Sequence, residues 1–165
     1  MYYNIKKLLI LILFVLIFST VIFAQTDNRL NGTWVFIQEG IELEFVFRNG
    51  SYDSVIDGTP VERGMYTTRD SILTLNSTHS HGNFYNEMFE FSRFESRWYS
   101  TNELTQALTP IFIEMGIPRE LVDEFIKEVI SESESQSFSY TIDVNTLILT
   151  NPSDRTMLVF TKRPG

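Results

Sequence analysis

The chain has 165 residues, no cysteine, and a formal net charge of −8 at neutral pH. An acidic surface of this kind repels phosphate backbones and anionic headgroups, which argues against nucleic acid and anionic membranes as partners. The lack of cysteine excludes thiol catalysis and disulfide bonds, so packing alone must hold the fold together.

Residues 1–24 have the pattern of a secretory signal peptide. Lys6 and Lys7 precede the apolar run LLILILFVLIF, and Ala24 precedes a polar stretch. We therefore expect cleavage after Ala24 and an exported protein, periplasmic or secreted, with no stable membrane insertion afterwards. The alternative is an uncleaved anchor, because the apolar segment reaches the short limit of the ~17–25 residues that cross a bilayer.

Residues 25–165 are expected to form a single domain, long enough to bury one core. Cleavage would remove two of the 13 basic residues and none of the 21 acidic residues, which makes the exported part still more acidic. It also lacks the cysteine at the cleavage site that a bacterial lipoprotein needs.

Three strands and two tight turns are predicted over residues 31–57. The first strand opens at Gly32-Thr33-Trp34, and residues 41–48 (IELEFVFR) alternate apolar and charged side chains, as in a strand with one buried face. Asn49-Gly50 is a strong hairpin signal, and a third strand is expected to follow it over residues 51–57.

Further strands are predicted along the rest of the chain. Residues 61–68 and 72–76 form one hairpin, and residues 83–94 favour a long extended strand. Residues 137–143 and 146–151 form another hairpin, and residues 156–162 form the last strand.

Over residues 101–131 the spacing of apolar residues changes from that of a strand to that of a helix. A first helix is expected to start at Thr101, a new turn to begin at Thr109-Pro110, and a third helix to run from Pro118 to about Ile130. The apolar stripe of the third helix includes Leu121, Phe125, Ile126 and Val129. We expect the helices to cap one end of the strands, with a lid or a docking face for a partner as alternatives.

Eight or nine short strands with tight connections indicate a mainly β fold. We predict an up-and-down antiparallel β-barrel with a helical insertion (about 101–131) capping one end, since a sandwich would need longer crossings between its sheets.

Residues at both ends of the strand series resemble bacterial lipocalin-like domains, which have calycin-type β-barrels. The likeness lies in Gly32-Thr33-Trp34, Asn49-Gly50-Ser51-Tyr52, Gly64-Met65-Tyr66 and the final run MLVFTKR. It implies that Trp34 closes the barrel floor and that Lys162 or Arg163 packs across its ring. The chain departs from the family pattern because it lacks the Thr-Asp-Tyr motif and because helices interrupt its strands.

The barrel interior is the first candidate site, and a set of aromatic side chains either lines a cavity there or fills it. These residues are Trp34, Phe36, Phe45, Phe47, Tyr52, Tyr66, Phe89 and Phe91. The expected ligand is a small apolar molecule or lipid, with no cofactor.

Catalytic and metal-binding patterns are weak. His79 and His81, with Glu87 or Glu90, would make a metal site, but they lie in a loop-like polar stretch where exposed histidines are common. No Gly-x-Ser-x-Gly elbow and no phosphate-binding loop is present. We therefore expect a non-catalytic, exported binding protein without a metal. The alternative is a protein-interaction or envelope-structural module with a solid barrel and helices that form the contact surface.

Overall fold

The computed structural model describes residues 26–90, 92–131 and 135–164. The expected signal segment, residues 1–24, and Phe91 lie outside the described residues. Within the described part of the chain, no helix is both long and apolar enough to cross a membrane.

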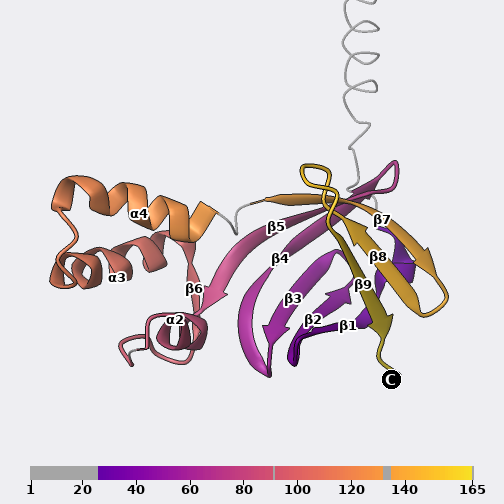
Figure 1. Cartoon of the computed structure of the whole chain (residues 1–165), viewed down its shortest axis with the longest axis horizontal. Helices are drawn as coiled ribbons and strands as arrows, with labels where there is room; N and C mark the ends of the chain where they lie inside the picture. Colours follow the sequence, from indigo (N-terminus) through magenta and orange to yellow (C-terminus); the bar gives the residue numbers. More distant parts are fainter. Residues whose placement is uncertain (1–25, 91, 132–134, 165) are drawn as a thin grey trace, which may run out of the picture.

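Nine strands form one antiparallel sheet, and eight of them close into a barrel (Figure 1). The strands are β1 (Gly32–Gln38), β2 (Ile41–Arg48), β3 (Ser51–Ile56), β4 (Thr59–Arg69), β5 (Ile72–His81), β6 (Trp98–Ser100), β7 (Gln136–Asp143), β8 (Thr146–Thr150) and β9 (Met157–Lys162). The barrel closes because β1 pairs with both β2 and β9, while β4 and β5 also pair. The predicted closed antiparallel barrel is confirmed, and it is consistent with a calycin-like fold.

Two-residue turns set the register of the first strands. Asn49 and Gly50 both have positive φ (47° and 93°), and so do Asp57 and Gly58 (48° and 82°). Two positive φ values give the type I′ turn, whose twist matches that of the flanking strands. The predicted strands over residues 31–57 are therefore confirmed to within a residue or two.

The prediction for residues 77–94 was wrong in two ways. The stretch taken for a loop around His79 belongs to β5, and the predicted strand over residues 83–94 is replaced by helix α2 (Gly82–Met88). The His81 side chain accepts a hydrogen bond from the backbone N–H of Asn83 and so caps this helix. Short apolar runs fit the periods of both helix and strand, so periodicity alone could not decide between them.

The predicted break before Pro110 was also wrong, because helix α3 (Thr101–Glu114) runs through it, followed by α4 (Arg119–Ser131). Proline inside a helix costs about 3 kcal/mol. Burial of Leu108, Ile111 and Phe112 in the same helix offsets that cost.

The described residues form two hydrophobic cores. The barrel core contains Leu30, Trp34, Phe45, Phe47, Tyr52, Tyr66, Leu73, Leu75, Tyr140, Leu147, Leu149 and Phe160. The helical core contains Tyr85, Phe94, Tyr99, Leu104, Leu108, Ile111, Phe112, Val122, Ile126 and Ile130. Figure 1 shows α2, α3 and α4 gathered beside the barrel, where β5 and β6 reach out to them. Ile126 and Val129 of the apolar stripe pack in or against this helical core, whereas Leu121 and Phe125 stay exposed.

Candidate functional site

One end of the barrel, here called the closed end, is sealed around Trp34. This side chain is fully buried, and its Nε1–H donates to the carbonyl oxygen of Leu30 (2.6 Å), which belongs to the 3-10 helix Asn28–Leu30. Lys162 pairs with Trp34 across β1 and β9, and its Nζ lies 5.1 Å from the centroid of the indole ring. This cation–π contact therefore links the first strand of the barrel to the last one.

Gly32 and Arg163 complete the closed end in different ways. A Cβ atom on Gly32 would lie 2.9 Å from Cε of Lys162, so the glycine leaves room for the lysine to reach Trp34. The guanidinium of Arg163 turns to Glu42 (2.8 Å) and Glu44 (3.0 Å) on β2 instead. Of the two basic residues considered from sequence, the structure places only Lys162 over the ring.

Four of the eight aromatic side chains considered as a cavity lining fill the half of the barrel next to the closed end, here called the closed half. Trp34, Phe47, Tyr52 and Tyr66 are buried in the barrel core, where Phe47 and Tyr66 meet edge to face with centroids 5.0 Å apart. This half of the barrel is therefore packed with its own side chains.

Of the other four candidates, three lie elsewhere. Phe45 belongs to the barrel core and also lines a cavity at the opposite end, and Phe36 packs against the core. Phe89 was misplaced by the strand prediction, because it packs against the helical core. Phe91 lies outside the described residues.

The end of the barrel next to the helices holds a pocket of about 310 Å³, here called the mouth pocket. Its apolar walls come from the barrel and from the helices. They consist of Leu43, Phe45, Ile56 and Val61 on β2–β4, and of Phe84, Tyr85, Met88 and Val129 on α2 and α4. Its polar side chains are Ser54, Glu62, Ser80 and Gln136. The barrel and the helical insertion thus form this pocket together.

Three of the polar side chains form a row across adjacent strands. Glu62 on β4 is paired with Ser54 on β3 and with Ser80 on β5. Ser54 is 3% exposed and Ser80 is 7% exposed, so both hydroxyls lie inside the barrel wall. Small polar residues leave space where large apolar ones would fill it, which explains why the barrel is open at this end.

Glu62 is held by a hydrogen bond from the neighbouring strand. The Tyr52 hydroxyl on β3 donates to Oε1 of Glu62 (3.1 Å). Burial raises the pKa of the Glu62 carboxyl, although the neighbouring Tyr52 and Ser77 hydroxyls oppose the shift. Burial and the neighbouring Glu62 charge raise the pKa of the Tyr52 hydroxyl, so it remains a donor at neutral pH.

Helix α2 forms the outer wall of the pocket because it starts directly at the end of β5. A Cβ atom on Gly82 would lie 2.2 Å from the carbonyl oxygen of Glu95, so only glycine permits this close approach. Burial raises the pKa of the Tyr85 phenol, although the nearby Ser80 side chain opposes the shift. The β5–α2 junction therefore brings an aromatic wall up to the polar row.

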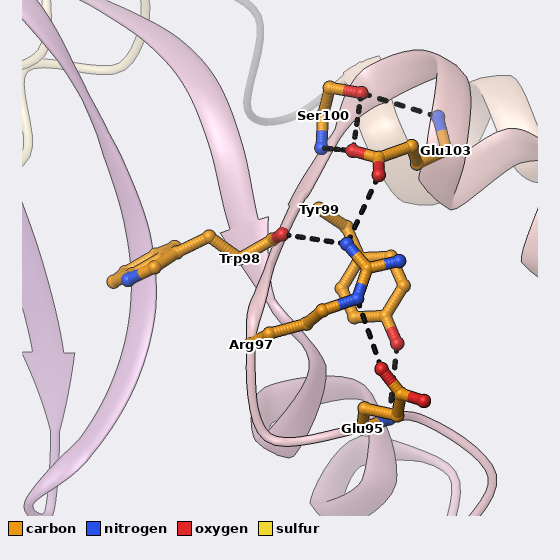
Figure 2. Close-up of polar contacts among 6 residues, drawn as sticks. All are labelled: Glu95, Arg97, Trp98, Tyr99, Ser100 and Glu103. Atoms are coloured by element: carbon orange, nitrogen blue, oxygen red, sulfur yellow. Dashed lines mark hydrogen bonds and ion pairs between the residues drawn. The ribbon is translucent and has the colours of Figure 1, made fainter.

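The joint between β6 and α3 holds the helices in place (Figure 2). The Arg97 guanidinium bridges Glu95 (3.2 Å) and Glu103 (3.1 Å) and lies 3.8 Å from the ring centroid of Tyr99. Ser100 and Glu103 form a capping box at the start of α3, and the Ser100 N–H bond contributes most to lowering the pKa of Glu103 to about 2.

Trp98 attaches the same joint to the barrel. Figure 2 shows Trp98 and Tyr99 pointing to opposite sides of β6. Cζ of Arg63 lies 3.9 Å from the Trp98 ring centroid, and the His81 ring meets the indole edge to face. Arg63 Nε is 3.2 Å from Oδ1 of Asp53, a charge contact without hydrogen-bond geometry.

The two histidines serve local structure. His81 is buried and caps α2, and burial lowers its pKa. His79 Nδ1 lies 3.0 Å from the hydroxyl oxygen of Thr78. Among the described residues, no group of three or more His, Asp or Glu side chains is placed to hold a metal ion.

The four α4 residues considered as a lid or partner face separate into two pairs. Leu121 and Phe125 are each 42% exposed, whereas Ile126 is buried in the helical core and Val129 lines the mouth pocket. Only the first pair is available on the surface, and only Val129 faces the candidate site.

Sequence reasoning missed the polar row, although part of its signal was present. Alternate residues of a strand face the same side, so Glu62 on β4 faces inward together with Gly64 and Tyr66. By the same rule, Ser54 on β3 faces inward together with Tyr52. Ser80 could not be found this way, because the β4–β5 pairing shifts register between Arg63 and Gly64.

Comparisons of the chain with protein-family models, with curated proteins and with solved structures found no match.

Proposed function

We propose that this protein is an exported, lipocalin-like binding protein that holds a small apolar molecule in the mouth pocket without catalysing a reaction. The observation that carries the proposal is the pocket itself, about 310 Å³ in volume and walled mainly by apolar side chains. Ligand sites are typically concave and apolar with a few placed polar groups, and this volume is at the small end of their range.

The division of the barrel into two halves supports this function. The closed half is solid and stabilised by Trp34 and its neighbours, so it can hold the open half rigid without a ligand. Because side chains pack the closed half around Trp34, ligand size is limited by the mouth pocket and not by the full length of the barrel. A compact molecule or one short acyl chain fits this space better than a long-chain lipid.

A fluorescent apolar probe tests the proposal. N-phenyl-1-naphthylamine brightens on transfer from water to an apolar site, so titration into the purified protein should give a saturable increase in emission. Ile56→Trp adds an indole to the pocket wall and should weaken probe binding at least about tenfold. The control, Val159→Trp, places the same side chain on an exposed position of β9 and should change binding little.

Failure of the wild-type protein to bind the probe saturably would contradict the proposal. Equal weakening by Ile56→Trp and Val159→Trp would show that the probe binds elsewhere. Native mass spectrometry of the protein purified from its producing cells would add a direct measurement, since a co-purifying small mass is expected.

The exposed pair Leu121 and Phe125 favours a second function, in which α4 docks on another protein of the envelope. A photo-crosslinking residue in place of Phe125 should then capture a defined partner, while the same residue at Val159 should not. Equal labelling from both positions would count against this alternative.

A further inference from the structure

We infer that the mouth pocket selects amphiphiles with a protonated amine head, and that Glu62 is the residue that recognises this head. The inference rests on the proposed binding function and specifies its ligand class. Of the twelve described residues that line the pocket, Glu62 alone has a charged side chain.

The polar side chains next to Glu62 lie deep in the pocket, and the apolar side chain of Met88 lies near its opening. Ser54 and Ser80, on either side of Glu62, are almost fully buried, whereas Met88 on α2 is 53% exposed and marks the outer rim. A ligand with one polar end would therefore enter with its head inward and leave its apolar tail between the barrel rim and α2.

The described groups that face Glu62 include no positive charge, so a cationic ligand would complement its carboxylate. Tyr52 from β3 and Tyr85 from α2 both carry pKa values raised first of all by burial, so they are neutral donors at neutral pH. Arg63, the next residue on β4, contacts Asp53 and Trp98 instead of the pocket. No described cation lines the pocket to neutralise the carboxylate.

An ammonium head matches these surroundings better than an alcohol or a carboxylate. Burial disfavours an isolated carboxylate, and a bound cation restores the lost stabilisation through a charge-assisted hydrogen bond. A carboxylate head would meet like charge, and a hydroxyl head would gain only a weaker hydrogen bond. The pocket should therefore rank three ligands of equal chain length as ammonium, then alcohol, then carboxylate.

Displacement of N-phenyl-1-naphthylamine by octylamine, 1-octanol and octanoate measures this ranking. At neutral pH the wild-type protein should bind octylamine at least about tenfold more tightly than 1-octanol, the effect expected of one hydrogen bond to a charged group. Glu62→Gln keeps the size of the side chain and removes its charge, so the ratio of the two affinities should fall to near one. Glu90→Gln removes an exposed carboxylate just after α2 and should leave the ratio unchanged.

The pH dependence in the wild-type protein provides a second test that needs no variant. Lowering the pH from about 7 to about 4 protonates Glu62, whose pKa is raised, while the alkylamine stays charged. The preference for octylamine over 1-octanol should decrease over this range. This measurement decides the matter even if Glu62→Gln does not fold.

The outcomes separate the two proposals. If the probe and 1-octanol bind but octylamine shows no preference, or if Glu62→Gln keeps the preference, the amine inference is wrong and the binding function stands. If neither the probe nor 1-octanol binds the wild-type protein, both proposals fail. A tenfold preference that Glu62→Gln and low pH each abolish supports the inference.

Discussion

Replacement of Gly64 by alanine tests how closely β4 and β5 approach beside the mouth pocket. Gly64 is buried, pairs with Ser77, and follows the point where the β4–β5 register shifts. A Cβ atom there would lie 2.0 Å from the carbonyl oxygen of Asn76 and 2.9 Å from Cα of Ser77. Both neighbours are backbone atoms, so no side-chain rotation can relieve the contact.

The cost of this substitution should lie at the upper end of the range for overpacking. Extra methyl groups in a packed interior typically cost about 1–3 kcal/mol, and the lower values apply where flexible side chains give way. Because the two strands must separate here, we expect Gly64→Ala to lower the free energy of unfolding by about 3 kcal/mol. The shift would also reach the Glu62–Ser80 pair, two residues along β4, and weaken probe binding.

Urea unfolding followed by circular dichroism measures the effect, with Gly58→Ala as the matched control. Gly58 has φ +82° and open space around its missing Cβ, so its alanine variant carries only the conformational cost of about 1–2 kcal/mol. Gly58→Ala should also leave the mouth pocket unchanged. The reasoning would be refuted by a Gly64→Ala protein that is as stable as Gly58→Ala and binds the probe as the wild type does.

Two further predictions concern the closed end of the barrel. Lys162→Met keeps much of the aliphatic length over Trp34 and removes the charge, so the free energy of unfolding should fall by about 0.5–1 kcal/mol; an unchanged value would show that the cation–π contact contributes nothing. A hydrogen bond from the Arg29 side chain is the main reason that the pKa of Asp27 falls to about 2, below its value of 3.8 in an unfolded chain. The unfolded state therefore takes up the proton first, and the stabilisation from Asp27 is fully present above about pH 4 and is lost as the pH falls towards 2. Asp27→Asn should accordingly be less stable than the wild type at neutral pH and equal to it near pH 2 in urea unfolding, whereas a difference independent of pH would contradict this account.

Local sequence patterns predicted the barrel well because strands and turns follow local rules. The alternation over residues 41–48 and the Asn49-Gly50 and Asp57-Gly58 dipeptides each define a face or a turn without help from distant residues. The same rules failed over residues 83–94, where Tyr85 and Phe89 suit either period and a helix capped by His81 forms instead of a strand.

The sequence by itself thus determined the closed antiparallel barrel, because alternation and turn chemistry are written in neighbouring residues. It placed Trp34 at the start of the first strand. Its alternating pattern also placed Ser54 and Glu62 on the inward face of their strands. Only the tertiary structure decided that the aromatic side chains fill one half of the barrel and leave the other open. Packing and cavities depend on contacts between strands far apart in the chain, and on a register shift beside Gly64 that no local pattern reveals.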